Sequence, residues 1–406
     1  MLLIYNIGLQ LYFYTVYIAS LFNKKARLWI DGRKNTNYVK FAHSTWFHFA
    51  SLGEFEQGRP VLEAFKLKYP GKKIVITFFS PSGYEIRKNT PLADAVYYLP
   101  LDTAANAHRF IEAIKPDMAI FTKYEYWCHF FNELNKRNVP LYVISGIFRP
   151  KQIFFKWYGG LHRKMLSFVT YFFVQDERSK QLLQNIGINN ATVSGDTRFD
   201  RVWANAQQPK ALPVIKDFIN GSKIFIAGST WPEDEKLLVS LVKQYPGWKF
   251  IFAPHEVGEE KIKNLISLLP ANAFIRYSQI AEEKSQISNL KSQILVIDNI
   301  GMLSSLYQYG DIAYIGGGFG AGIHNTLEAA AFGLPVIFGP NYHKFKEPVD
   351  LIRIKAGFSI NNEAELKTAV SFLVDDKERI AISKKIKDYV RNNTGAKDTI
   401  MDYINA

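Results

Sequence analysis

The stretch Gly316-Gly317-Gly318-Phe319-Gly320-Ala321-Gly322-Ile323-His324-Asn325-Thr326-Leu327-Glu328 decides how we interpret the fold of this chain. An apolar segment, 311–315, precedes it, and an Ala-rich segment that ends at Gly333 follows it, before a second apolar run at 335–338. This order predicts a strand, a glycine-rich loop, a helix and a second strand. The backbone N–H groups of such a loop and the positive end of the helix dipole can bind a phosphate group. The stretch therefore predicts a nucleotide site.

Three polar side chains follow the glycines, namely His324, Asn325 and Glu328, and we expect them in the first helical turn, facing one ligand. The Asn–Glu spacing also matches a capping box, in which Asn325 caps the helix and Glu328 reaches back to its N–H group. Five glycines within seven residues exceed what a cap requires. We therefore favour a binding role, with Glu328 accepting hydrogen bonds from ribose hydroxyls.

The spacing Gly316-x-Gly318-x-x-Ala321 can be fitted to the dinucleotide fingerprint G-x-G-x-x-A. That fingerprint normally opens the first βα unit of a domain, and an acidic residue ends the next strand. Here the spacing occurs late in the chain, and the strand expected at 336–338 has no acid at its end. We therefore exclude a dehydrogenase.

The overall composition indicates a folded protein of more than one domain. A chain of 406 residues exceeds what one core usually serves, and 48% hydrophobic residues are typical of a folded protein. The formal net charge of +13 is consistent with nucleic acid, an anionic membrane surface or a polyanionic substrate as partner. The single cysteine, Cys128, excludes a disulfide framework and a cysteine-based zinc site.

Short apolar runs alternate with amphipathic segments in both halves of the chain, which predicts two doubly wound parallel sheets. The alternation is interrupted at 203–213, where glutamines and prolines cluster. We predict an N-terminal segment, 1–25, and two α/β domains, 26–208 and 209–406, with the last helix able to pack back on the first domain. Strands are expected at 45–50, 73–79, 118–121, 141–145 and 171–174, and then at 223–227, 249–253, 274–277, 294–297, 312–315 and 336–338.

The first 23 residues contain no charged side chain, and Lys24, Lys25 and Arg27 follow them. The run only just reaches the length of about 20 apolar residues that a spanning helix requires. Its aromatic residues and trailing cations favour an anchor in or on the bilayer, with the basic end cytoplasmic. A first helix packed on the protein's own core is the alternative. Whether the anchor spans the membrane or lies in its interface is left open.

Ligands of open α/β sheets bind beyond the carboxyl ends of the strands, so the residues at these positions are candidates. Glu54 follows the flexible Gly53 and suits a general base, although it could merely complement a helix dipole. Glu125 lies between aromatic residues, where a carboxyl group is either a buried, paired group or a functional one. Thr230, followed by Pro232, is expected to cap the next helix. No set of residues has metal-ligand spacing.

A basic stretch without acids covers residues 149–164, with aromatic residues between its cations. Such a pattern is found in proteins that bind single-stranded nucleic acid. It equally suits an anionic amphiphile, whose head group meets the cations while its tails meet the rings. Together with the apolar N-terminus, the pattern favours the amphiphile, and we do not expect nucleic acid as a partner.

Taken in order along nearly the whole chain, these motifs resemble those of the 3-deoxy-D-manno-octulosonic acid (Kdo) transferases of lipopolysaccharide assembly. The resemblance implies the GT-B fold, two Rossmann-like domains that face each other across a cleft. It implies CMP-Kdo as donor, a lipid A precursor as acceptor, no cofactor or metal, and a place on the cytoplasmic face of the inner membrane. The motifs are Ser51-x-Gly53-Glu54, Ser82-Gly83, Glu125-x-Trp127, Ser194-Gly195-Asp196-Thr197-Arg198-Phe199-Asp200, Ala227-Gly228-Ser229-Thr230, Asp298-x-x-Gly301 and the glycine stretch up to Glu328.

The resemblance also implies roles for single residues. Glu54 would be the catalytic base and Glu125 a second catalytic acid. The N-terminal domain would bind the acceptor and the C-terminal domain the donor. The donor site would comprise Ser229, Thr230, His255, Gly301, Gly316, Gly317, Gly318, His324, Asn325 and Glu328. The acceptor or Kdo site would comprise Ser51, Gly53, Ser82, Gly83, Arg149, Lys151, Lys156 and Arg198.

Two alternatives from other functional classes remain. A nucleotide-sugar epimerase can share the two-domain architecture, but a soluble isomerase does not need the apolar N-terminal segment. A non-catalytic protein that binds anionic lipids would explain the charge and the aromatic residues, but it would not explain the glycine-rich loop.

Overall fold

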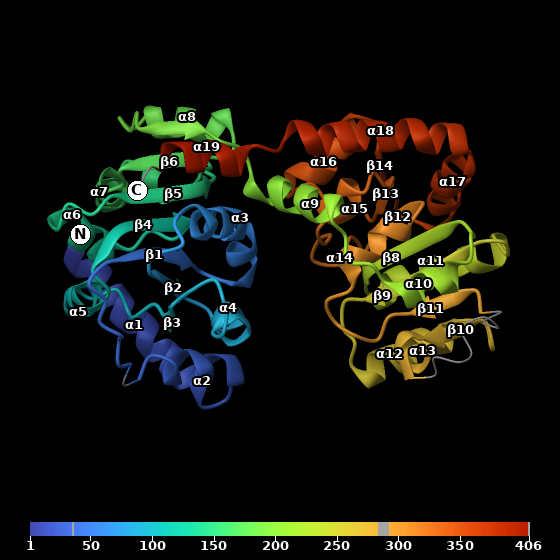
Figure 1. Cartoon of the computed structure of the whole chain (residues 1–406), viewed down its shortest axis with the longest axis horizontal. Coiled ribbons are helices and arrows are strands. Elements are labelled where there is room, and N and C mark those ends of the chain that lie inside the picture. The colour runs from blue at the N-terminus through green and yellow to red at the C-terminus, as the bar shows by residue number, and fades with distance from the viewer. Residues whose placement is uncertain (35, 283–291, 405–406) are drawn as a thin grey trace. The chain divides into compact units, whose positions relative to one another are not determined.

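A computed structural model describes residues 1–34, 36–282 and 292–404. It divides into two compact units, unit 1 with Met1–Arg201 and Asn393–Ala406, and unit 2 with Val202–Asn392 (Figure 1). The division lies inside helix α9 (Thr197–Gln207), several residues before the expected boundary at 208/209, because the start of α9 is bonded into unit 1. Each unit is a helix-covered parallel sheet, so the prediction of two doubly wound α/β domains is confirmed.

The sheet of unit 1 has the strand order β3-β2-β1-β4-β5-β6-β7, and all its strand pairs are parallel. The sequence did not indicate β3 or β7, which are short strands at the two edges. The strands are β1 (Ser44–Phe49), β2 (Ile74–Phe78), β3 (Ala95–Tyr98), β4 (Pro116–Thr122), β5 (Leu141–Gly146), β6 (Tyr171–Val174) and β7 (Ala191–Val193). The helices between them are α3 (Leu52–Lys68), α4 (Pro81–Arg87), α5 (Ala104–Ile114), α6 (Cys128–Lys136), α7 (Gly160–Ser167) and α8 (Glu177–Gln184).

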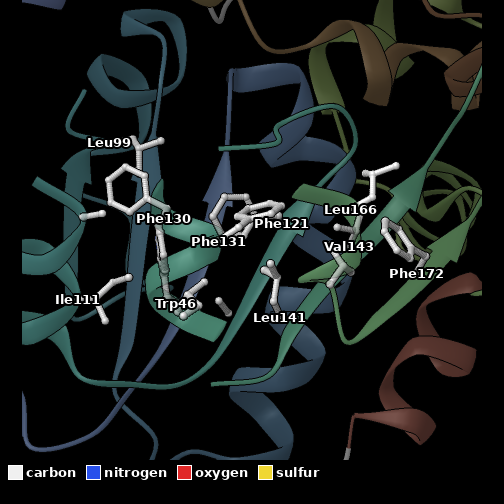
Figure 2. Packing of buried hydrophobic residues seen from close by; sticks show 14 of the residues in the cluster. Trp46, Leu99, Ile111, Phe121, Phe130, Phe131, Leu141, Val143, Leu166 and Phe172 are labelled. Atoms are coloured by element: carbon white, nitrogen blue, oxygen red, sulfur yellow. The ribbon is translucent and has the colours of Figure 1, made fainter. Parts of the chain in front are cut away.

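Both faces of this sheet are buried, which explains why its central strands read as continuous apolar runs. On one face Trp46 packs edge-on against Phe121 and Phe130, with ring centroids 4.9 and 5.6 Å away (Figure 2). It packs in the same way against Phe110, at 5.1 Å. The other face of β1 contributes Phe47 and Phe49 to a second cluster. Since side chains alternate along a strand, His48 shares the face of Trp46 and is a polar residue within an apolar layer.

The last helix, α19 (Ala396–Tyr403), belongs to unit 1, although α18 (Asp376–Asn392) before it belongs to unit 2. Lys68 of α3 donates to the Met401 carbonyl at 3.1 Å. The N–H groups of Gly395 and Lys397 donate to the Asp200 carboxylate at 2.7 and 3.2 Å. These bonds fix the C-terminal helix on the first unit.

Two helices precede the first sheet, α1 (Leu2–Ser20) and α2 (Lys24–Asp31). Among the described residues, α1 is the helix that is long and apolar enough to cross a membrane. It is nevertheless attached to unit 1 by polar groups. The Tyr5 hydroxyl donates to the buried Asp102 at 2.6 Å, and Asn6 Oδ1 lies 2.7 Å from His129 Nε2.

The sheet of unit 2 has the order β10-β11-β9-β8-β12-β13-β14, again with parallel pairs throughout. The edge strand β14 was not expected from the sequence. The strands are β8 (Ile224–Thr230), β9 (Lys249–Pro254), β10 (Phe274–Arg276), β11 (Ile294–Val296), β12 (Ile312–Ile315), β13 (Val336–Phe338) and β14 (Gly357–Ser359). Its helices include α10 (Pro213–Ile219), α11 (Pro232–Gln244), α12 (Glu259–Leu268), α13 (Tyr277–Glu282), α14 (Leu303–Leu306), α15 (Leu327–Ala331), α16 (Lys346–Arg353) and α17 (Glu363–Val374).

Candidate functional site

Glu54 lies in the first turn of α3, just beyond the carboxyl end of β1. Ser51 is the N-cap residue of this helix, and its hydroxyl donates to Glu54 Oε2 at 3.2 Å. Burial, reinforced by the negative charge of Glu125, raises the pKa of Glu54 to about 7, although Ser51 and Lys123 act in the opposite direction. Desolvation therefore outweighs the hydrogen bonds of Ser51 and the charge of Lys123. A carboxyl group with this pKa suits a general base at neutral pH.

Glu125 lies in the loop between β4 and α6, and β4 is the direct neighbour of β1. Its Oε2 atom is 3.5 Å from Nε2 of His48, a buried residue of β1. Because the charge of Glu125 contributes to the pKa of Glu54, the structure brings the two predicted carboxylates into one electrostatic environment.

Cations of the same unit surround Tyr124, which precedes Glu125. Burial raises the pKa of Tyr124, while Arg149 and Arg198 lower it and Glu54 raises it further. Arg198 is held by Asp196 through bonds of 2.9 Å to Nε and 2.6 Å to Nη2. The predicted residues Arg149 and Arg198 are thus both close to Tyr124, the residue before Glu125.

Lys123 ends β4 with a left-handed φ of 61°, which is uncommon for a residue with a side chain. Its positive charge lowers the pKa of both Glu54 and Asp196. Residues in such a conformation concentrate at functional sites. Sequence reasoning did not select Lys123, since its conformation leaves no signal in the sequence.

The turn that carries Ser82 and Gly83 lies next to the turn that carries Ser51 and Gly53. The link is a bond of 2.7 Å from Ser80 N–H to the Ala50 carbonyl. The Ser82 hydroxyl is 3.0 Å from that of Ser80, so it takes part in the cap of α4. A Cβ at Gly83 would lie 2.3 Å from the Phe78 ring, so packing requires this glycine, whereas Gly53 is exposed and open on its outer side.

Lys151 and Lys156 lie in the loop that follows β5. Arg163 braces this loop by donating to the Lys156 carbonyl at 2.7 Å. The Phe154 ring packs against Tyr126, with centroids 5.1 Å apart, and this contact ties the loop to the segment of Glu125. Within the described part of the chain, no recorded contact joins Lys151 or Lys156 to the carboxylates themselves.

The glycine-rich loop of unit 2 is organised around a buried carboxylate, that of Asp234. Asp234 accepts hydrogen bonds from the Gly317 N–H at 2.9 Å and from the Tyr314 hydroxyl at 2.6 Å. The Gly316 N–H donates to the Gly228 carbonyl at 2.9 Å, and a Cβ at Gly316 would lie 2.2 Å from the Ser229 carbonyl oxygen. We expected the backbone N–H groups of this loop to be free to bind a phosphate group. This expectation is wrong for Gly316 and Gly317, because their N–H groups are hydrogen-bonded within the protein.

The helix after the loop begins later than expected. Because α15 starts at Leu327, His324 and Asn325 precede it instead of lying in its first turn. Asn325 Oδ1 accepts from the Leu327 N–H at 3.0 Å, and Asn325 Nδ2 donates to Glu328 Oε1 at 3.2 Å. The N-cap residue of α15 is Thr326, so the alternative in which Asn325 caps the helix is wrong. Asn325 precedes the cap and bonds to the Leu327 N–H group and to the side chain of Glu328.

Three flat rings lie together at the ends of β8, β9 and β12. The ring of His255 is stacked on His324 at 4.2 Å and on Trp231 at 4.9 Å between centroids. Trp231 Nε1 donates to His324 Nε2 at 3.0 Å, so the neutral His324 ring has its proton on Nδ1. Burial, together with His255, lowers the pKa of His324. Sequence reasoning found both histidines but missed Trp231.

A pocket of about 290 Å³ opens between these rings and the glycine-rich loop. Its walls combine ring faces with glycine backbone, and Glu233 and Asp234 supply its carboxylates. A flat or hydroxylated ligand group fits such a lining. The pocket is lined by Trp231, Glu233, Asp234, Gly317, Phe319, Gly320, Ala321, Gly322 and His324.

Three other predicted donor-site residues lie around this region with different surroundings. Thr230 is buried, and its hydroxyl donates to Glu235 at 2.9 Å. It also ends β8, so Trp231 and not Thr230 is the N-cap residue of α11, which corrects our expectation. Ser229 is half-buried with a left-handed φ of 53°. Gly301 has a φ of 95° in an exposed turn after β11, and no recorded contact of the described residues joins it to the pocket.

Comparison with known proteins connects these sites to one family. Residues 23–201 match the family model described as 3-deoxy-D-manno-octulosonic-acid transferase (kdotransferase). The 3-deoxy-D-manno-octulosonic acid transferase of Haemophilus influenzae is 28% identical over 375 residues, which are 88% of this chain and 86% of that protein. The transferase of the same name from Chlamydia muridarum is 27% identical over 86% of this chain and 82% of its own.

Solved structures with the same architecture show the fold alone, because their sequence identities are low. UDP-GlcNAc 2-epimerase from Neisseria meningitidis has a TM-score of 0.59 at 15% identity and covers 89% of this chain and 98% of its own. A glycosyltransferase from Rickettsia africae has a TM-score of 0.55 at 14% identity, with the same two coverages. The family match over residues 23–201 and the relatives that span most of the chain show a glycosyltransferase that is similar to Kdo transferases.

Proposed function

We propose that the protein is an inverting glycosyltransferase that moves Kdo from CMP-Kdo to a lipid A precursor. The observation that carries this proposal is Glu54, a carboxyl group beyond the end of β1 whose pKa is raised to about 7. The relatives named as Kdo transferases support the choice of sugar. The likeness to epimerases is one of fold and favours no epimerase activity.

The proposed reaction uses Glu54 as the base. Its carboxylate takes the proton of an acceptor hydroxyl, and the oxygen attacks the anomeric carbon of Kdo from the side opposite the leaving group. The bond between that carbon and the phosphate oxygen breaks, and CMP leaves with the electron pair. The sugar carboxylate and the phosphate are anionic, and Lys123, Arg149 and Arg198 supply cations near Glu54 and Tyr124.

For unit 2 we propose the donor nucleotide as the ligand of the pocket. The stacked faces of Trp231 and His324 suit a flat or sugar ring, and the glycine backbone allows close approach. Among the residues that the structure describes, no three His, Cys, Asp or Glu side chains converge as metal ligands do. CMP carries a single phosphate, which cationic side chains can stabilise as it leaves.

We further propose that α1 lies in the membrane interface and does not cross the bilayer. The side of the helix with Tyr5, Leu9 and Ser20 faces unit 1, whereas Ile4 and Ile18 on the other side are 71% and 61% exposed. A helix fixed along one side by polar bonds can bury only its outer side in lipid.

The outer side of α1 lies beside residues 149–164, the stretch with aromatic residues between its cations, which we call the basic-aromatic loop. A Cβ at Gly160 would lie 3.0 Å from Met1 Cε, so the start of α1 is beside this loop. Trp157 of the loop is 90% exposed, and the exposed Lys151 lies in the same segment. Apolar side chains flanked by cations are typical of surfaces that bind anionic membranes, which is where a lipid acceptor would be found.

The first experiment tests transfer itself. The full-length protein is incubated with CMP-Kdo, with and without a lipid A precursor, and free CMP and Kdo-lipid are measured. Acceptor-dependent release of CMP is expected. Acceptor-independent isomerisation would instead indicate an epimerase, and lipid binding without any turnover a non-catalytic protein. The Glu54→Gln variant should retain CMP binding and lose transfer, while Glu63→Gln, on the exposed side of the same helix, should remain active.

A second experiment tests the placement of α1. Single cysteines replace Leu3 or Phe22, at the two ends of the helix, in a Cys128→Ala background. A membrane-impermeant maleimide should label both positions from the cytoplasmic side. Labelling of the two ends from opposite sides would show that α1 spans the bilayer and refute its placement in the interface.

A further inference from the structure

His48 occupies an unusual place for a polar ring. It is fully buried at the centre of the sheet of unit 1, and its ring lies 4.7 Å from that of Phe121. Its two nitrogens point to different partners. Nδ1 is 2.8 Å from the Thr77 hydroxyl of β2, and Nε2 is 3.5 Å from Glu125 Oε2 beyond β4. Packing alone does not explain a buried imidazole whose nitrogen lies within hydrogen-bonding distance of a candidate catalytic carboxylate.

The hydrogen bonds around Thr77 determine which nitrogen of His48 has the proton. Trp46 Nε1 can only donate, and it donates to Thr77 Oγ1 at 2.8 Å. The Thr77 hydroxyl still has its own hydrogen, and His48 Nδ1 lies 2.8 Å from its oxygen. We infer that this hydrogen is donated to Nδ1, which places the proton of the neutral ring on Nε2, directed at Glu125.

The ring stays neutral because of where it lies. Burial lowers the pKa of His48, and the positive charge of Arg33 lowers it further, while Glu125 and Thr77 act in the opposite direction. A neutral ring with its proton on Nε2 can donate to Glu125 and orient the carboxylate of that residue. The separation of 3.5 Å is long, as catalytic hydrogen bonds often are before substrate binds.

We propose that His48 is a positioning residue of the transfer reaction, which donates from Nε2 to Glu125 and holds that carboxylate in place near Glu54. The inference rests on the proposed role of Glu54 as the base. The chain of groups runs from Trp46 through Thr77 to His48 and then to the carboxylate of Glu125. Nothing in the sequence motif alone assigns this task to the histidine.

Other charged groups that face the two carboxylates do not replace this bond. Glu54 is faced by Glu125, by Lys123 from the end of β4, and by Ser51 of its own helix cap. Glu125 is faced by His48 and by Tyr12 of α1, a phenol whose pKa is raised by burial and, to a lesser degree, by Glu125. Lys123 attracts the carboxylate of Glu54, so the raised pKa of Glu54 depends on burial and on the charge of Glu125.

The kinetic test compares two substitutions of His48 that differ in one hydrogen-bond donor. His48→Gln keeps an amide N–H near the position of Nε2, whereas His48→Phe keeps a flat ring and removes the donor. Without the donor, the carboxylate of Glu125 is no longer held near Glu54, and the pKa of Glu54 falls because it depends on that nearby charge. In a plot of kcat/KM against pH, the rise on the acidic side (the acid limb) should then move to lower pH. We expect a displacement of about half a unit to one unit in His48→Phe, and a much smaller one in His48→Gln.

Controls separate this role from simple packing. Glu125→Gln should move the limb in the same direction, and the double variant His48→Phe with Glu125→Gln should move it no further. His43→Gln, an exposed histidine just before β1 that pairs with Asp117, should leave the limb in place. A limb that stays in place in His48→Phe while activity falls would overturn the proposal, because loss of packing lowers activity without displacing the limb.

A measurement that needs no turnover completes the test. With ¹⁵N-labelled histidine, the NMR signals that disappear in His48→Gln are assigned to His48, and the nitrogen shifts report which nitrogen has the proton. We expect protonated Nε2 and unprotonated Nδ1, and loss of this preference in Thr77→Val. A proton on Nδ1 would refute the inference even if the protein transfers Kdo, whereas failure of Glu54→Gln to abolish transfer would refute the proposed function and leave the tautomer unchanged.

Discussion

Replacing Glu54 by glutamine should stabilise the protein at the pH where it removes activity. The pKa of Glu54 is raised from 4.5 to about 7 in the folded chain, mainly because the charged form is buried. The folded state therefore binds the proton more tightly than the unfolded state, and stability falls as pH rises from 4.5 to 7. Over that window the loss amounts to about 3 kcal/mol. A neutral glutamine avoids this loss.

The assay is urea unfolding of the wild-type protein and of Glu54→Gln between pH 4 and pH 9. The difference in the free energy of unfolding should change by about 3 kcal/mol in favour of the variant between pH 4 and pH 8. Only the change of this difference with pH reports on Glu54. The altered bond to Ser51 adds a contribution to the difference in the free energy of unfolding that does not depend on pH. Glu63→Gln, an exposed substitution on the same helix, is the control and should show no such trend. A difference that does not change with pH would refute the argument that Glu54 is a desolvated base.

The remaining predictions concern α1, the glycine-rich loop and the chemistry of the leaving group. Tyr5→Phe removes the bond to the buried Asp102 and should lower the free energy of unfolding by about 1 to 3 kcal/mol, whereas Tyr14→Phe, on the exposed side of α1, should change it little in the same urea titration. Gly317→Ala forces a side chain into a φ of 90° and should weaken CMP binding and lower the melting temperature. Gly247→Ala, at an exposed glycine of unit 2 outside the pocket where a Cβ has room, should bind CMP normally in calorimetry. Transfer should continue in EDTA, and a rate that requires added divalent cation would contradict the proposed stabilisation of CMP by side chains alone.

The two parallel sheets were predictable because buried strands leave continuous apolar runs and the helices between them leave an amphipathic period. The edge strands β3, β7 and β14 were missed, since strands of three or four residues leave too short a pattern. The division inside α9 was also missed, because a helix shared by two units shows no change in composition.

At the candidate site, the sequence identified side chains but not the partners of their hydrogen bonds. Glu54 was selected from its place after an expected strand, yet its raised pKa depends on burial and on Glu125, 71 positions away in the numbering. Gly317 was selected as a ligand group, yet its N–H is bonded to Asp234, which no motif indicated. The roles proposed for Ser82 and Gly301 stay predictions, as do those of Lys151 and Lys156 in the basic-aromatic loop.

The sequence by itself determined the order of strands and helices, the family resemblance and the positions at which chemistry is expected, because these depend on patterns between near neighbours along the chain. Only the tertiary structure decided the raised pKa of Glu54, the place of His48 between Thr77 and Glu125, and the attachment of α1 to Asp102. Each of these depends on a desolvated group and a partner far away in sequence. Electrostatic interactions and hydrogen bonds of that kind exist only after folding has removed water and brought the two groups together.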